Sequence, residues 1–375
     1  MSEISTATTH DTLPETQPKV EKSELNSDEK KETAPSIDVE QIPETNTIEE
    51  TDSSSDDKPL QQVEVVVEDV KNHAYNKATE SIYDSSLIID SYEFDYVVSK
   101  LREFFKGLGF LEAHPQNRLS ILAACEDPFT VAQFDYAGKV WPLPQTGQMW
   151  LEYELLTNPD IPGCFCVSTS YREEENPKEG RHELIFPMFE FEMPGTFDDL
   201  LQMENDLCKF LGFNCDHNRA RLTEDFPGGN YLSMCGKYTA SDNILTDYHE
   251  SLMYKEYGDV FFLTHFPYNT SPFWNMKKSP IKGSTGDEVA LKCDVIMGGM
   301  ETIGSAERAD DVDMMREQFH TISDGGYSRL LYNLFGKDRV LKELDEFLQH
   351  DFIPRFGGGI GVTRMISAMK KAELM

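Results

Sequence analysis

Apolar side chains recur at helical spacing across residues 91–106 of this 375-residue chain. The recurring positions are Phe94, Val97, Val98, Leu101, Phe104 and Phe105. Because residues three and four apart share one face of a helix, the pattern predicts an amphipathic helix, which Gly107 and Gly109 then end. Further helices are predicted from about Gly147 onward and over residues 197–211, 248–257, 310–322 and 337–348.

A different pattern, with period two, runs through residues 164–193 and predicts two strands. Alternate side chains of a strand point to opposite faces, so Arg172 and Glu174 are expected on one side of the first strand. One side of the second strand carries Phe186, Met188, Glu190 and Glu192. Charged groups gathered on one face are costly to bury unless something charged pairs with them, which indicates a ligand-binding face. The alternative is an ordinary solvated outer face.

Strands are also predicted over residues 258–266 and 293–297, and the chain closes with a strand, a glycine turn and a helix after Phe356. Hairpins of strands therefore alternate with intervening helices, and no internal repeat is visible. This order predicts an α+β domain with a mostly antiparallel β-sheet flanked by helices.

The first 70 residues differ from the rest because they contain no Phe, Trp or Tyr. They carry about 19 acids against about five lysines, and such a segment cannot bury enough apolar surface to offset its ordering entropy. We therefore expect a disordered acidic tail over residues 1–75 and one globular domain over residues 76–375. The net charge of −33 stays strongly negative without the tail, which disfavours nucleic acid as a partner.

The seven cysteines include no Cys-x-x-Cys pair and no Cys and His at zinc spacing. We expect reduced thiols, as in a reducing compartment. No apolar run approaches the roughly 20 residues that a membrane-spanning helix needs, and the amino end lacks the basic and apolar regions of a signal peptide. These features predict a soluble, cytoplasmic protein without a membrane partner.

A glycine cluster at residues 357–361 precedes the last helix. Glycine loops before helices often bind phosphates through backbone amides. A dinucleotide-binding unit needs about 30 residues, and fewer than about 20 follow Gly357; a Walker loop lacks its Lys and its Ser or Thr. Arg364, in the first turns of the helix, could meet a phosphate or a purine ring. The alternative is close packing of a helix on a sheet.

Asp294 and Glu301 lie seven residues apart with two glycines between them, so a bent strand could bring both carboxylates to one site. One or two carboxylates, completed by phosphates and water, suit magnesium. Arg308 follows seven residues later and could clasp a carboxylate or an amide with two hydrogen bonds. The alternative is a structural ion pair between Glu301 and Arg308.

These three clusters resemble the three signature motifs of class II aminoacyl-tRNA synthetases of the aspartate, asparagine and lysine branch. KLREFFKGLGFLEAHP at residues 100–115 is similar to motif 1, although it is one residue short before Pro115. YREE with RHELIFPMFEFEM is similar to motif 2, and GGGIGVTRMI is similar to motif 3. The order and spacing agree over about 270 residues. The resemblance implies ATP and Mg²⁺ as cofactors, an amino acid as substrate and a homodimer formed through motif 1.

The resemblance also implies roles at the nucleotide. Arg172 matches the arginine that bridges the α-phosphate of ATP and the carboxylate of the amino acid. Glu174 matches the acid that binds the adenine amino group, and Phe186 matches the ring on which adenine stacks. The remaining nucleotide positions are Arg181 and His182, near the outer phosphates, and Arg364, which would cover the other face of the base and touch the γ-phosphate.

On the amino-acid side, the resemblance assigns Asp294 and Glu301 to magnesium and Arg308 to the substrate side chain. QTGQMWLE at residues 145–152 is similar to the version of asparagine-specific enzymes, which assigns Gln148 to the amino acid. Glu190 stands where those enzymes have Glu and aspartate enzymes have Asp, and it would bind the substrate ammonium. Asparaginyl-tRNA synthetase and the archaeal-type asparagine synthetase, which lacks an anticodon-binding domain, are therefore the best matches.

The chain also departs from that pattern. We expect no anticodon-binding barrel, because residues 1–70 lack the core residues of one. Motif 2 has Ile185 in place of its usual Glu, and the usual lysine near Trp274 is replaced. The motif 2 loop carries Glu173, Glu174, Glu175 and Glu179. Such a loop should repel a phosphate chain, so tRNA is possible but disfavoured as the acceptor.

Several functions therefore stay open. The first is a ligase that activates asparagine or aspartate as its adenylate and charges tRNA. In the second, ammonia attacks an aspartyl adenylate and yields asparagine. The others are a synthetase paralogue that modifies a protein and a non-catalytic regulator that binds an amino acid.

Overall fold

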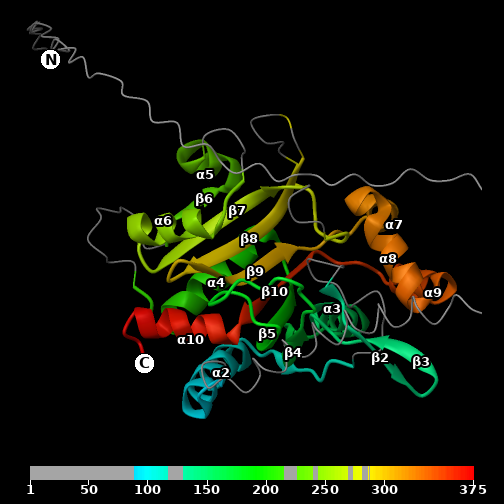
Figure 1. The fold of residues 1–375 in the computed structure, drawn as a ribbon, viewed down its shortest axis with the longest axis horizontal. Helices are drawn as coiled ribbons and strands as arrows, with labels where there is room; N and C mark the ends of the chain where they lie inside the picture. Colours follow the sequence, from blue (N-terminus) through cyan, green and yellow to red (C-terminus); the bar gives the residue numbers. More distant parts are fainter. Residues whose placement is uncertain are drawn as a thin grey trace, which may run out of the picture. The chain divides into compact units, whose positions relative to one another are not determined.

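The computed structural model describes residues 88–116, 130–214, 226–239, 244–268, 273–280, 286 and 288–375. The tail predicted over residues 1–75 and its boundary lie outside these ranges. Figure 1 shows that the described part is built around one large sheet with helices on it. No helix in these ranges is long and apolar enough to cross a membrane.

The large sheet has eight strands in the order β1-β4-β5-β10-β9-β8-β7-β6. Their bounds are β1 (Leu111–Glu112), β4 (Cys164–Tyr171), β5 (Ile185–Pro194), β6 (Gly228–Asn230), β7 (Val260–Pro267), β8 (Val289–Met297), β9 (Met300–Glu307) and β10 (Arg355–Gly361). Only β1 with β4 and β6 with β7 pair in parallel, so the predicted α+β class with a mostly antiparallel sheet is confirmed. A separate hairpin joins β2 (Gln133–Tyr136) to β3 (Lys139–Pro142).

The helices agree with the apolar periodicity where the sequence predicts them. They are α2 (Ser91–Gly107), α3 (Gln148–Thr157), α4 (Phe197–Phe210), α5 (Tyr231–Tyr238), α6 (Asp247–Tyr257), α7 (Val312–Thr321), α8 (Gly326–Phe335), α9 (Lys337–Phe347) and α10 (Val362–Lys371), with a 3₁₀ turn η4 (Ile322–Gly325). Helix α2 begins where Asp90 Oδ1 accepts hydrogen bonds from the backbone N–H of Tyr92 and Glu93 at 2.9 and 3.0 Å. The apolar pattern did not predict α5 or α8.

The main core lies on one face of the sheet, under α2, α4 and α10. Phe105 of α2 packs there with its ring centre 5.2 Å from those of Phe189 and Phe191. Because side chains alternate along a strand, β5 turns Met188, Glu190 and Glu192 to the opposite face. The predicted division of β5 into two faces therefore holds.

The opposite face is covered at its two sides and carries the candidate site between them. Helix α3 packs on β4 and β5, and α5 and α6 pack on β7 and β8 through an apolar cluster around Met253 and Phe261. Strands β10 and β9 lie in the middle of this face. Strands β8 and β9 are joined by Gly298 and Gly299 with φ values of 58° and 85°, the tight turn that positive φ at both residues allows.

Candidate active site

Strand β10 forms the floor of the candidate site, and its glycines add no side chains of their own to that face of the sheet. A Cβ atom on Gly357 would lie 1.7 Å from Glu192 Oε2, and one on Gly359 would lie 2.6 Å from Met188 Cε. Only glycine fits beside these side chains of β5, the strand with which β10 pairs. The predicted glycine turn is therefore wrong: residues 357–361 are the strand itself, and the helix follows directly.

Arg172 and Phe186 lie together next to the Gly361 end of this floor. The guanidinium carbon of Arg172 is 5.3 Å from the centre of the Phe186 ring, within the range of a cation–π contact. Strand β4 ends at Tyr171, so the prediction that Arg172 and Glu174 lie on a strand face is wrong, and both belong to the following loop. The backbone N–H of Arg172 donates to the carbonyl of Leu184 at 2.8 Å, which holds the start of the loop beside β5.

Glu174 and His182 meet across the loop that joins β4 to β5. His182 Nδ1 lies 2.8 Å from Glu174 Oε2, and the Glu174 side chain is the more buried of the two. Lys178 of the same loop pairs with Asp247 of α6. The loop is therefore closed on itself by one pair and attached to α6 by another.

Arg364 connects Arg181 to Glu301, which lies at the start of β9. Arg364 donates from Nη1 to the carbonyl of Glu301 at 2.7 Å and from Nη2 to the carbonyl of Arg181 at 3.4 Å. Arg181 Nη2 donates to both carboxylate oxygens of Glu250 at 2.7 and 2.8 Å. Arg181 and Arg364, both predicted to bind the nucleotide, thus lie at the same end of the site, and Glu250 of α6 pairs with Arg181 there.

Asp294 and Glu301 lie on the two strands of the β8–β9 hairpin and face each other over Gly304. A Cβ atom at Gly304 would be 3.1 Å from Glu301 Oε1 and 3.8 Å from Asp294 Oδ1. The carboxylates are therefore brought together by a hairpin and not by a bend within one strand. Lys292 Nζ lies 3.2 Å from Asp294 Oδ1 and 4.5 Å from the centre of the Phe266 ring. Among the described residues, no three metal-binding side chains cluster, so a metal here would need substrate oxygens as well.

Glu190 is 1% exposed and binds the first turn of α3. Its carboxylate accepts hydrogen bonds from the Gly147 N–H at 2.9 Å, from Ser168 Oγ at 2.5 Å and from the Thr146 hydroxyl. Burial raises the pKa of Glu190, and these hydrogen bonds oppose the rise. The carboxylate thus fixes the helix that carries Gln148, in addition to any contact with a ligand.

Gln148 is 5% exposed, and its Nε2 has no hydrogen-bond partner among the described residues. The Oγ of Ser170 and the Oδ1 of Asn275 are likewise buried without a partner in that part of the chain. Leaving a buried polar group unsatisfied costs about 1–3 kcal/mol. These atoms, on β4, on α3 and on the segment that packs against α3, are therefore suited to a polar ligand.

Arg308 lies in a buried network of opposite charges at the Arg355 end of the floor. Its Nε and Nη2 donate to the two carboxylate oxygens of Glu192 at 3.1 and 3.2 Å. Arg355 Nη2 donates to Glu152 Oε2 at 2.7 Å, and Asn275 Nδ2 donates to Glu152 Oε1 at 2.7 Å. Burial raises the pKa of Glu192, and Arg308 opposes the rise. The network links two arginines to two glutamates.

The sequence reading missed the residues Glu152, Lys292, Glu250, Asn275 and Arg355. Glu152 and Lys292 could have been predicted from the sequence. Glu152 lies one helical turn after Gln148, and Lys292 lies two residues before Asp294 on the same strand, so each shares a face with a predicted site residue. The other three come close to the site only through the fold.

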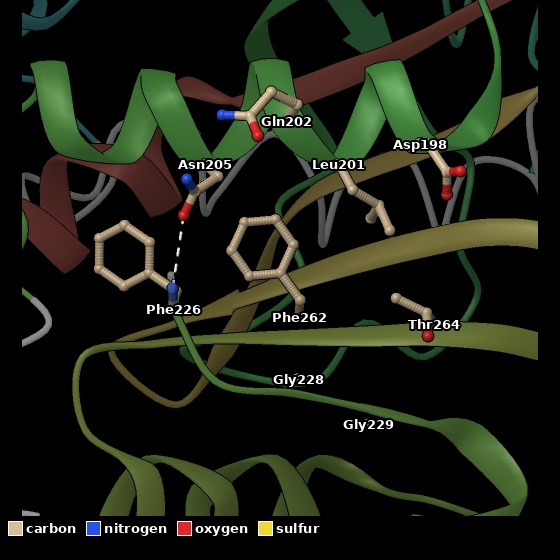
Figure 2. A pocket seen from close by; sticks show the side chains of 9 residues that line it. All are labelled: Asp198, Leu201, Gln202, Asn205, Phe226, Gly228, Gly229, Phe262 and Thr264. Atoms are coloured by element: carbon tan, nitrogen blue, oxygen red, sulfur yellow. Dashed lines mark hydrogen bonds between the residues drawn. The ribbon is translucent and has the colours of Figure 1, made fainter. Parts of the chain in front are cut away.

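A separate pocket lies between α4 and strands β6 and β7, and Figure 2 shows the side chains around it. It has a volume of about 450 Å³ and is lined by Asp198, Leu201, Gln202, Asn205, Phe226, Gly228, Gly229, Phe262 and Thr264. Phe262 belongs to the main core with α4, so the pocket opens on the face of the sheet that the candidate site does not use. It contains no predicted site residue.

Comparison with known proteins agrees with this geometry. A family model described as tRNA synthetases class II (D, K and N) matches residues 91–374. The asparagine–tRNA ligase of Pelotomaculum thermopropionicum is 22% identical over 289 residues, which cover 71% of this chain and 62% of that protein. The asparagine–tRNA ligase of Desulforamulus reducens is 23% identical over 274 residues, with 67% and 59% covered. The chain thus spans about three fifths of the length of these relatives.

The fold is also that of a solved structure. Asparaginyl-tRNA synthetase from Pyrococcus horikoshii, complexed with asparaginyl-adenylate, superposes with a TM-score of 0.58 at 20% sequence identity. The match covers 75% of this chain and 64% of that one.

Proposed function

Because this chain belongs to the family of class II tRNA synthetases of the D, K and N type, we propose that it activates an amino acid with ATP to form an aminoacyl adenylate. One observation carries the proposal. A single face of the sheet gathers the Arg172–Phe186 pair, two further arginines and the carboxylates of Asp294 and Glu301 around the glycine strand β10. Fixed cations suit the phosphates of a nucleoside triphosphate, and the relative from Pyrococcus horikoshii holds an adenylate.

The nucleotide would lie with its base against Phe186 and its phosphates toward the arginines. Glu174, held by His182, would accept a hydrogen bond from the adenine amino group, because a carboxylate oxygen is a strong acceptor. Arg364 would cover the other face of the base and reach the γ-phosphate, since a guanidinium plane stacks on aromatic rings as well as binding phosphate. Arg181 and His182 would face the outer phosphates.

In the reaction, a carboxylate oxygen of the amino acid forms a bond to the α-phosphorus of ATP. The bond from that phosphorus to the bridging oxygen of pyrophosphate breaks, and pyrophosphate leaves with its electron pair. Negative charge accumulates on the α-phosphate oxygens in the transition state. Arg172 lies beside Phe186, where its guanidinium could contact both the α-phosphate and the attacking carboxylate and stabilise that charge.

Asp294 and Glu301 would hold magnesium together with phosphate oxygens. The donors fit, because two carboxylate oxygens converge over Gly304 and hard oxygen ligands are those magnesium accepts. When bound, the metal would neutralise charge on the outer phosphates. Lys292, with its ammonium nitrogen 3.2 Å from Asp294 Oδ1, would hold that carboxylate in place.

The charge balance at the Arg308 end favours asparagine over aspartate as the substrate. Within this network each arginine already has a glutamate beside it, so with both carboxylates ionised the four side chains carry no net charge together. The carboxylate of aspartate would add an unbalanced charge to a buried site, which costs several kcal/mol. The amide of asparagine could accept from Arg308 and donate to Glu192 without changing the charge. Gln148 and Glu190 would bind the ammonium and carboxylate end.

The direct test is amino-acid-dependent exchange of pyrophosphate into ATP by the purified full chain. Asparagine, aspartate and lysine are supplied separately, and exchange is expected with asparagine. Exchange with aspartate alone would overturn the charge argument but keep the activity. An absence of exchange with every amino acid would overturn the proposed function itself.

A second candidate is formation of asparagine from aspartyl adenylate and ammonia. The observation that favours it is the acidic loop after β4, where Glu173, Glu175 and Glu179 are exposed and Lys178 is paired with Asp247. Such a loop repels a phosphate chain but admits a small acceptor. If aspartate, ATP and ammonium yield asparagine and AMP without RNA, this candidate replaces the tRNA ligase. Asparagine-dependent charging of tRNA would exclude it.

We also propose that the chain forms a homodimer through α2 and β1. Both elements expose large apolar side chains: Tyr92 is 88% exposed and Leu111 is 53% exposed. Strand β1 also lies at the edge of the sheet, where unpaired backbone groups can meet a second copy. Light scattering should give twice the monomer mass, and a monomer at micromolar concentration would exclude this interface.

A further inference from the structure

One closed cycle of hydrogen bonds joins four separate segments at the Arg364 end of the site. Arg181 donates to Glu250, and Glu250 Oε2 accepts from the backbone N–H of Glu301 at 3.0 Å. Arg364 completes the cycle through the carbonyls of Glu301 and Arg181. The loop after β4, α6, β9 and α10 are therefore connected around the place where the outer phosphates are proposed to bind.

Glu250 is the member of this cycle to which neither the family motifs nor the proposed reaction gives a role. Its side chain and that of Arg181 are each 15% exposed, so the charge pair is largely shielded from water. The contact uses only Nη2 of Arg181. The Nη1 and Nε groups of Arg181 make no hydrogen bond to other described residues and stay available for an anion.

We propose that Glu250 is a positioning residue for ATP, which holds the guanidinium of Arg181 in the orientation that the outer phosphates require. The inference rests on the proposed function. A donor that is already oriented needs no rearrangement when the phosphate charge arrives, so the binding free energy is not spent on ordering a long side chain. Glu250 also binds the backbone N–H of Glu301, so it holds Glu301 and Arg181 in a fixed position relative to each other.

Glu250→Gln tests this role with little change of shape. The amide oxygen of Gln can still accept from the Glu301 N–H, while the charge that orients Arg181 is removed. In the exchange assay the KM for ATP is expected to rise about tenfold, as is typical when an orienting partner is lost. The KM for the amino acid should stay within about twofold of the wild-type value, and the melting temperature should stay within about 2 °C of it. A purely structural role of Glu250 would instead shift both quantities.

Asp247→Asn is the matched control. Asp247 lies in the first turn of the same helix and pairs with Lys178 of the same loop, but the two side chains are 40% and 52% exposed. An exposed pair contributes little, so the KM for ATP should not change. A second check is the Arg181→Gln variant: adding Glu250→Gln to it should change the KM for ATP by less than about twofold, because the partner is already gone.

The outcomes separate the two proposals. If the wild type exchanges pyrophosphate and Glu250→Gln keeps its KM for ATP, the positioning role is wrong and the activity stands. A further tenfold loss in the double variant would also exclude a role through Arg181. If the wild type shows no exchange with any amino acid, the proposed function and the positioning role both fail.

Discussion

Replacing Glu204 should stabilise the protein at neutral and alkaline pH. This acid belongs to α4, on the face of the sheet away from the candidate site, and it is 0% exposed. Neither carboxylate oxygen accepts a hydrogen bond of good geometry from the described residues, and the nearby Ser305 hydroxyl donates to the carbonyl of Cys293 at 3.2 Å. The Ser305 hydroxyl and the Cys293 thiol still lower the pKa of Glu204, but burial has the larger effect. Burial raises the pKa of Glu204 to about 8. The group is therefore protonated in the folded protein at neutral pH.

The magnitude follows from the difference between the folded and unfolded pKa values. The unfolded chain titrates this carboxyl near 4.5 and the folded protein titrates it near 8. Because the folded value is the higher one, the contribution to stability is fully present below pH 4.5 and is lost as the pH rises through 8. At about 1.4 kcal/mol per unit, the wild type should lose about 3 kcal/mol between pH 5.5 and pH 8.5 through this group.

Urea unfolding of the wild type and of Glu204→Gln at these two pH values measures the effect. The amide has the shape of the protonated acid but does not titrate, so its advantage in free energy of unfolding should grow by about 3 kcal/mol from pH 5.5 to pH 8.5. Asp206→Asn, an exposed acid on the same helix, should show no comparable growth. An advantage for Glu204→Gln that is equal at both pH values would refute the reasoning, because the carboxylate would then ionise in the folded protein without penalty.

Three further predictions concern the candidate site. Arg172→Ala should lower the rate of pyrophosphate exchange by about 100-fold or more with an unchanged melting curve, and retained exchange would exclude its role at the α-phosphate. Gly357→Ala should lose at least about 3 kcal/mol or fail to fold, because its Cβ would lie 1.7 Å from a carboxylate oxygen of Glu192; an unchanged urea midpoint would contradict the close contact. Arg355→Met should cost about 3–5 kcal/mol in urea unfolding by leaving Glu152 with a buried charge, and Glu152→Gln in the same chain should recover most of the loss.

Local periodicity explains why so many elements could be predicted from the sequence. Helix α2 buries Val97, Val98, Leu101 and Phe105, the positions that the spacing of three and four selects. The two faces of β5 follow from the period of two in the same way. The glycines of β10 show the limit of such reasoning. A run of glycines by itself predicts a turn. Residues 357–361 form a strand because they pair with β5, whose Glu192 and Met188 side chains leave room only for glycine.

The candidate residues show the same division. The sequence and its family resemblance could mark Arg172, Phe186, Asp294 and Glu301, and the structure places them on one face or at its edge. The sequence could not show that Arg308 would bind an internal carboxylate. The sequence predicted that Arg308 binds the substrate side chain, and nothing in the residues around Arg308 indicates that a glutamate of β5 pairs with it.

The sequence by itself therefore determined most of the helices, the two faces of β5 and the family, because each depends on residues close together in the chain or on motifs in a fixed order. The tertiary structure alone decided the charge partners. Arg308 and Glu192 are 116 residues apart, and Arg355 and Glu152 are 203 apart. Such pairs form only after the sheet has assembled, since a buried charge is stable only where the fold supplies an opposite one. The same physics makes the network neutral, and that neutrality is the basis for favouring asparagine.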